Sequence, residues 1–147
     1  MWKLNAVERL ARWRDFRKSL DNLPIEQAVQ SVADFWTSCP FTPYYLDPEE
    51  SSKWPDPWTL VEENYYCDLA RSLGMLYTIT LTLHNPESEI RVYYDPNANV
   101  YYNLVWIDQG KYVLNMNEGE VLNKTHIAKH FELRNAYGEK ELKLNSY

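Results

Sequence analysis

The chain has 147 residues, enough for one domain with a hydrophobic core but few for two. Apolar residues make up 45% and charged residues 24% of the sequence, which excludes disorder as the main state. The net charge of −6 argues against a nucleic-acid partner, and the 4 glycines form neither a GxGxxG motif nor a P-loop, which excludes two nucleotide-binding classes.

Two amphipathic helices are expected in the first 38 residues. Apolar side chains recur at steps of three and four, as on one face of a helix, at Trp2, Ala6, Leu10, Trp13, Phe16 and Leu20. Pro24 suits the first turn of a second helix, and Cys39 with Pro40 ends it. The segment 1–38 is therefore predicted to be the helical N-terminal part.

Residues 39–58 are predicted to form an ordered, extended strap. Five of the 8 prolines lie in this segment, which disfavours a helix. The segment also holds four large aromatic residues, namely Tyr44, Tyr45, Trp54 and Trp58, which a flexible linker would lack. We expect the strap to lie over the core or against a partner protein.

A third helix and a strand are expected next, within the segment 59–117. The apolar spacing favours a helix from about residue 60 to residue 73, and Gly74 fits the position just after a helix end. In residues 75–83, apolar residues alternate with threonines, which is typical of a strand.

Three further strands are expected at residues 90–94, 100–107 and 111–116, and the short turns between them favour an antiparallel meander. The segment 118–147 is predicted to be a C-terminal helix and tail, with a short helix at 123–130 and then either a strand or a tail. The whole pattern predicts one α+β domain, residues 1–147, with helices packed on one face of about four antiparallel strands.

Cys67 is the residue with the clearest chemical potential, because the pattern places it early in a helix. The positive end of a helix macrodipole generally lowers the pKa of a nearby thiol. A cysteine nucleophile also needs an imidazole to accept its proton and a third group to orient that imidazole. The other reading of Cys67 is a small buried apolar side chain.

The sequence WPDPWTLVEENYYCDLARSLGMLYTITL, followed by strands, resembles the transglutaminase-like core of the papain-like superfamily over residues 58–117. This resemblance implies a histidine at the start of a later strand and an aspartate near the end of the next one. The residues around the first place are Tyr101, Tyr102 and Asn103, and the second place falls near Asn115. None of them is histidine or aspartate, so the resemblance implies a degenerate core without a catalytic base.

An enzyme stays open as an alternative. A cysteine hydrolase or acyl transferase of transglutaminase-like type would use Cys67 and an unexpected base, His84. Trp54 and Trp58 beside Asp56 allow a glycosidase to be considered.

No cofactor or metal is expected from the sequence. His126 and His130 stand four residues apart, but no HExxH motif joins them, so they are read as surface imidazoles. No apolar run reaches the roughly 18 residues that a membrane span needs.

Charge is unevenly distributed along the chain. Residues 1–20 carry a net charge of +4, and residues 21–66 carry −8. The basic segment can be read as binding an anionic membrane surface, nucleic acid, or an acidic protein surface of its own or a neighbouring copy, and we favour the last. Unlike patches on one molecule permit head-to-tail contacts between copies.

The leading prediction is a non-catalytic module for protein–protein binding and assembly. The W-P-x-P-W and Y-C-D-x-A-x-x-L-G-M patterns resemble small structural proteins of tailed bacteriophages, which implies a connector, tail or baseplate subunit that is made in the cytoplasm and incorporated into the virion. The expected partners are copies of the chain and neighbouring virion subunits, contacted through Trp2, Arg9, Arg12, Tyr44, Tyr45, Trp54 and Trp58. A further alternative is an acidic inhibitor or immunity-like protein that covers a basic active site.

Overall fold

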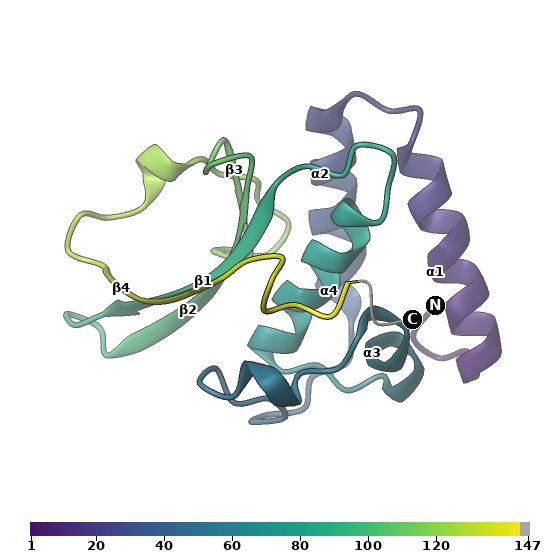
Figure 1. Cartoon of the computed structure of the whole chain (residues 1–147), viewed down its shortest axis with the longest axis horizontal. Coiled ribbons are helices and arrows are strands. Elements are labelled where there is room, and N and C mark those ends of the chain that lie inside the picture. The colour runs from purple at the N-terminus through teal and green to yellow at the C-terminus, as the bar shows by residue number, and fades with distance from the viewer. Residues whose placement is uncertain (145–147) are drawn as a thin grey trace.

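The structure is a computed structural model that describes residues 1–144. Its helices come first in the chain and pack against one face of a four-stranded antiparallel sheet, which confirms the predicted α+β class (Figure 1). The elements are α1 (Ala6–Leu20), α2 (Ile25–Phe35), α3 (Pro57–Glu63), α4 (Asp68–Thr80), β1 (Ser88–Asp95), β2 (Val100–Ile107), β3 (Tyr112–Leu114) and β4 (Glu132–Tyr137). Within residues 1–144, every helix is too short or too polar to span a bilayer.

The N-terminal helices form where the apolar periodicity predicts them. The Asn5 side chain caps α1 by accepting from the backbone N–H of Glu8 at 2.9 Å. Trp13 of α1 and Trp36, just after α2, are both fully buried. Their indole N–H groups donate to the same hydroxyl, Oγ1 of Thr78 in α4, at 3.0 and 3.1 Å. Thr78 therefore joins three helices in the middle of the core.

The strand predicted over 75–83 is wrong, and the helix predicted over 60–73 is confirmed as helical but divided between two helices, α3 and α4. α3 ends at Asn64, which adopts a left-handed conformation with φ 62°, and α4 then runs through Gly74 to Thr80. The apolar–threonine alternation misleads because α4 is buried on nearly all sides, so its threonines face the interior as well. Oγ1 of Thr78 donates to the carbonyl of Gly74 at 2.6 Å, which satisfies the hydroxyl within the helix.

Gly74 does not end a helix. A Cβ atom at this position would lie 2.4 Å from Cη2 of Trp36, so the glycine allows the Trp36 ring to approach the backbone of α4 closely.

The sheet has the strand order β3-β2-β1-β4, and all its pairs are antiparallel. The meander of β1, β2 and β3 agrees with the three strands predicted between residues 90 and 116. The fourth strand is β4, which pairs with β1, and not the segment 75–83. Of the two readings of residues 131–147, the strand is therefore right for 132–137, and residues 145–147 lie outside the described residues.

Each face of the sheet has its own cover. Ile90, Val92, Val105 and Ile107 pack with the helices in the main core. On the other face, Leu104, Trp106 and Val113 pack against Leu122, Ile127 and Phe131 from the segment between β3 and β4. Instead of the helix predicted at 123–130, this segment contains a single 3-10 turn, Lys124–His126.

The strap of residues 39–58 lies on the core of its own chain. Trp54 is only 2% exposed, and its indole N–H donates to the carbonyl of Asp47 at 2.8 Å. The Trp54 ring also meets Tyr137 of β4 edge to face, while the Tyr137 hydroxyl donates to the carbonyl of Pro48 at 2.6 Å. These contacts order the strap, in which residues 39–56 contain only a short 3-10 turn, Ser51–Lys53. Residues 57 and 58 belong to α3, so the extended segment ends two residues earlier than predicted.

Candidate functional site

Cys67 directly precedes α4, at a point where the strap contacts the chain. The backbone N–H of Thr42 donates to the carbonyl of Tyr66 at 2.8 Å, which fixes the chain just before the cysteine. Cys67 itself is the N-cap residue of α4, with extended backbone angles and 7% exposure. The predicted placement of this thiol at a helix N-terminus is therefore right, although the helix starts later than expected.

Two asparagines reach the same helix end from the sheet. Asn103 lies on the face of β2 that carries Val105 and Ile107, and Asn115 follows β3 with a positive φ of 71°. The Nδ2 atoms of Asn103 and Asn115 donate to the Asp68 carboxylate at 2.9 and 3.2 Å. Nδ2 of Asn115 also donates to the main-chain carbonyl of Asn103 at 2.9 Å. We call Asp68, Asn103 and Asn115 the amide cluster.

The amide cluster occupies the places where the transglutaminase-like resemblance implies a histidine and an aspartate. The structure brings Asn103 and Asn115 together beside Cys67, whereas Tyr101 is 56% exposed near the tip of the β1–β2 hairpin. A carboxamide nitrogen only donates hydrogen bonds, so it cannot take a proton from a thiol. Asn103 is 7% exposed, and its Oδ1 atom is buried without a hydrogen-bond partner among the described residues.

Asp68 is the member of this cluster that the sequence analysis does not single out. It faces solvent in the first turn of α4, where a carboxylate interacts favourably with the helix macrodipole. The signal in the sequence that could have pointed to Asp68 is its position directly after Cys67, in the first turn of a helix.

The alternative base, His84, lies at the wrong end of α4. It follows the C-terminus of the helix, and its Nε2 atom is 2.9 Å from the carbonyl of Leu20. A helix of 13 residues is about 20 Å long, so the structure does not bring His84 and Cys67 together.

The other two histidines lie on the sheet face that points away from α4. Nε2 of His130 is 3.0 Å from Oδ1 of Asp95, which alternates with Ile90 and Val92 along β1 and so faces the opposite side. Nδ1 of His126 accepts from the backbone N–H of Asn123 at 3.2 Å. Residues 1–144 contain no group of three or more His, Cys, Asp or Glu side chains arranged to hold a metal.

Neither the thiol of Cys39 nor the hydroxyl of Tyr45 can act as a base for Cys67. Burial raises the pKa of the Cys39 thiol, although the Arg71 guanidinium beside it acts in the opposite direction. Burial also raises the pKa of Tyr45, as does the hydrogen bond that its hydroxyl donates to Glu63, with a smaller contribution from Cys67. The Tyr45 hydroxyl therefore stays protonated at neutral pH and cannot act as a base.

The residues predicted to bind a partner fall into two groups. Arg9 and Trp54 are used inside the chain, because Arg9 is 9% exposed and donates through Nε to the carbonyl of Val61 at the end of α3. Trp2 packs against Trp36 with ring centroids 4.9 Å apart and donates to Ser38. The more accessible candidates are Arg12, Tyr44, Tyr45 and Trp58, of which Tyr44 is 97% exposed. Their contact with a partner stays a prediction.

Asp56, the carboxylate considered for a glycosidase, has a local structural role. Its side chain caps α3 by accepting from the backbone N–H of Thr59 at 2.7 Å.

Comparisons with known proteins identify the fold. No protein-family model and no curated protein sequence matches the chain. Among solved structures, calcium-bound LapG from Legionella pneumophila matches with a TM-score of 0.69 and 11% identity, covering 94% of this chain and 82% of that chain. EGTA-treated LapG from the same organism matches with a TM-score of 0.68 and 12% identity, covering 92% and 78%.

LapG has a transglutaminase-like cysteine protease fold, so the predicted fold resemblance is confirmed. The similarity extends over nearly the whole described chain and not only over residues 58–117. At 11–12% identity it shows a common fold, while the activity follows from the residues at the site.

Proposed function

We propose that this chain is a protein-binding and assembly module built on a transglutaminase-like fold, in which Cys67 is not a catalytic nucleophile. The observation that carries the proposal is the amide cluster. Asn103 and Asn115 hydrogen-bond to Asp68, the residue after Cys67, and they occupy the places where the resemblance implies an imidazole and a carboxylate.

The chemistry of the amides supports a binding role over catalysis. A general base contributes about 10²–10⁴-fold to the rate of a nucleophilic reaction, and an amide cannot replace it. Asn103 and Asn115 instead give hydrogen bonds to the charged side chain of Asp68, a type worth about 1.5–3 kcal/mol at its strongest and less at an exposed group. The cluster thus fastens the N-terminus of α4 to the sheet.

A cysteine hydrolase or acyl transferase is the second candidate. The fold similarity to LapG favours it, and so does the position of Cys67 at the N-terminus of a 13-residue helix. By themselves these two findings support a hydrolase better than a binding role. Such an enzyme would need a proton acceptor beside Cys67 that the described residues do not place there.

The reactivity of Cys67 separates these two functions. In a Cys39→Ser variant, iodoacetamide labelling at about pH 6.5 should be at least tenfold slower in the folded chain than in guanidinium, because Cys67 is buried and unassisted. A Cys67→Ser variant gives the background. Faster labelling of the folded chain than of the unfolded chain would overturn the proposal in favour of the hydrolase.

Two finer parts of the prediction depend on the sequence alone. Incorporation into a bacteriophage particle as a connector, tail or baseplate subunit rests on the resemblance of residues 50–116, and an inhibitor role rests on the acidic charge of residues 21–66. Both stay predictions.

A further inference from the structure

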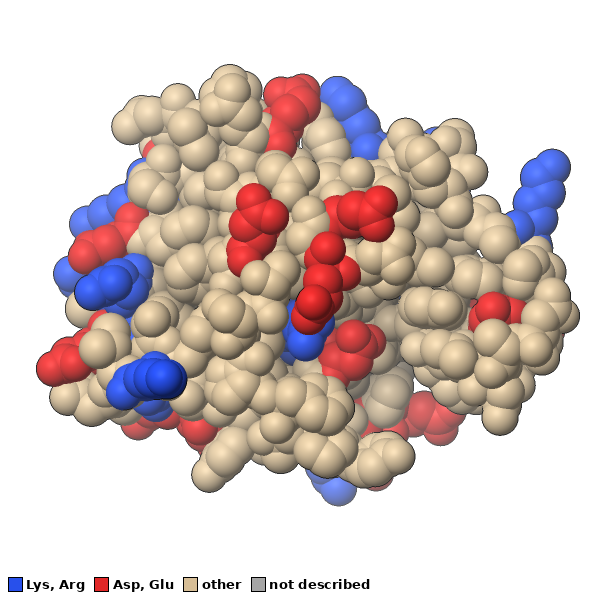
Figure 2. Space-filling model, turned by 180° about the vertical axis from the view of Figure 1, so that it is seen from behind, with Lys and Arg blue, Asp and Glu red and all other residues tan. Residues whose placement is uncertain are grey.

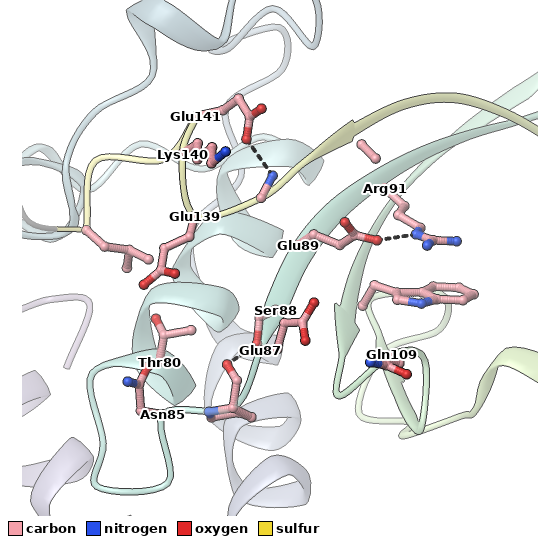
Figure 3. Close-up of a pocket in the computed structure, with 15 residues that line it drawn as sticks. Thr80, Asn85, Glu87, Ser88, Glu89, Arg91, Gln109, Glu139, Lys140 and Glu141 are labelled. Atoms are coloured by element: carbon pink, nitrogen blue, oxygen red, sulfur yellow. Dashed lines mark hydrogen bonds and ion pairs between the residues drawn. The ribbon is translucent and has the colours of Figure 1, made fainter.

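A groove of about 900 Å³ opens at the C-terminal end of α4, away from Cys67. Three parts of the chain form its walls, as Figure 3 shows: the end of α4 at Thr80, the start of β1 with Glu87 and Glu89, and the segment after β4 with Glu139 and Glu141. Trp106 of β2 also lines it. The groove therefore depends on the tertiary fold and is not a local loop feature.

The groove has a surplus of negative charge. Four carboxylates line it against two cations, Arg91 and Lys140. Nε of Arg91 pairs with Glu89 at 2.5 Å, and its guanidinium lies over the Trp106 ring, 4.2 Å from the centroid. The C-terminal end of α4 adds the negative end of a helix macrodipole. A cationic group entering the groove meets both sources of negative potential.

The chain carries a complementary surface on α1. Arg12, Arg14 and Lys18 are exposed, and Arg14 and Lys18 are four residues apart, so they lie on one face of the helix. Arg12 is two residues from Arg14 and points to another side of the helix, so we call Arg14 and Lys18 the basic face of α1. Figure 2, which views the molecule from behind, shows basic side chains toward the edge that α1 forms.

The backbone N–H of Leu83 donates to Asp21 at 2.9 Å, and Nε2 of His84 lies 2.9 Å from the carbonyl of Leu20. The end of α1 is therefore fixed to its own chain. The exposed basic face of α1 cannot turn into the groove of the same molecule, which points to a contact between molecules.

We propose that the groove receives the basic face of α1 from a second copy of the chain, which gives a head-to-tail contact. This inference rests on the proposed assembly function and names its partner. Different patches meet in such a contact, so it generates a ring or an open filament. The net charge of −6 does not prevent it, because salt screens charges beyond about 10 Å at 0.1 M while patches in contact attract.

The test uses charge reversal on each side of the contact. Sedimentation of the full chain at about 50 mM salt should show concentration-dependent association that is lost at about 500 mM salt. The variant Glu87→Lys/Glu139→Lys reverses two charges of the groove. The variant Arg14→Glu/Lys18→Glu reverses the two charges of the basic face. Each variant alone should be monomeric, because its modified surface repels the normal surface of the next copy.

Mixing provides the decisive result. In a mixture, the lysines of the first variant can meet the glutamates of the second, and the unmodified α1 of the first can meet the unmodified groove of the second. Association should therefore return, with the two variants alternating in equal amounts. Glu62→Lys/Glu120→Lys changes two exposed acids outside the groove and serves as the matched control, which should associate like the unmodified chain. Thermal melting of each variant checks that it is folded.

The outcomes separate this inference from the proposed function. An unmodified chain that is monomeric at low salt overturns the inference, as does a folded groove variant that associates normally. Neither result changes the reactivity of Cys67, so the non-catalytic assignment would stand and a different partner would be sought. An activated Cys67 would overturn the proposed function whatever the oligomeric state.

Discussion

Carboxylates lie at both ends of α4, but the helix macrodipole favours them at one end and disfavours them at the other. At the N-terminal end, the Asp68 carboxylate lies at the positive end of the helix macrodipole and accepts hydrogen bonds from Asn103 and Asn115. At the C-terminal end, the four carboxylates of the groove lie near the negative end of the same helix. At the first end the carboxylate is bound by two amides, although Oδ1 of Asn103 is buried without a hydrogen-bond partner among the described residues. At the second end Arg91 pairs with Glu89, and the four carboxylates still outnumber the two cations of the groove.

The proposed contact between copies is placed at the C-terminal end of α4. The N-terminal end of α4, next to Cys67, is bound to the sheet by the chain's own amides, Asn103 and Asn115. The groove with its surplus of negative charge lies at the C-terminal end of α4, about 20 Å away along a helix of 13 residues. The proposed contact therefore lies at the end of α4 that is remote from Cys67.

The largest expected effect on stability comes from Thr78, in the part of α4 between its two ends. Thr78→Val leaves the indole N–H groups of Trp13 and Trp36 without their shared acceptor in the core. We expect a loss of about 2–4 kcal/mol in the free energy of unfolding, measured with urea. Thr80→Val is the control, because the Thr80 hydroxyl donates only to backbone carbonyls, and an equal loss in both variants would contradict the assigned role.

A smaller loss is expected from the N-terminal end of α4. Asp68→Asn removes the charge that accepts from Asn103 and Asn115, and it should lower the free energy of unfolding by about 1 kcal/mol because Asp68 faces solvent. Asp15→Asn on the exposed surface of α1 is the matched control and should change stability by less than about 0.5 kcal/mol. Equal effects would mean that the amide cluster does not hold the helix end.

The smallest effect is expected for His84. His84→Ala removes one contact to the carbonyl of Leu20, so stability should fall by at most about 1 kcal/mol. Labelling of Cys67 by iodoacetamide should be unchanged, since the two side chains lie at opposite ends of α4. A clear drop in labelling would restore His84 as the base of a cysteine enzyme.

The parts of the fold that could be predicted are those with local patterns. Residues 100–107 are rich in aromatic and β-branched side chains and lie between two turn signals, which marks β2, and the apolar face with Trp13 and Leu20 marks α1. The strand prediction failed over residues 75–83 because α4 is surrounded by other elements, so its polar residues face the core as well. Gly74 was read as a helix end, whereas its role depends on the Trp36 ring, which is remote in sequence.

The candidate site was predictable where a family resemblance gave positions and unpredictable where it depended on tertiary contacts. Cys67, Asn103 and Asn115 were found from the order of helix and strands. The hydrogen bonds of Asp68 join α4 to β2 across 35 residues of sequence, and no local pattern encodes them. The groove at Thr80 is likewise built from segments that are distant in the chain.

The central claim is that the amides at positions 103 and 115 leave Cys67 without a proton acceptor. The most direct test compares iodoacetamide labelling of Cys67 at about pH 6.5 in the Cys39→Ser chain with labelling after Asn103→His and Asn115→Asp are added. Because Cys67 is buried in both proteins, the ratio of rates reports activation alone. The account predicts an increase of about tenfold or more in the substituted chain, provided it is folded. Equal and fast labelling in both chains would show that the native site already activates its thiol, which would contradict the account.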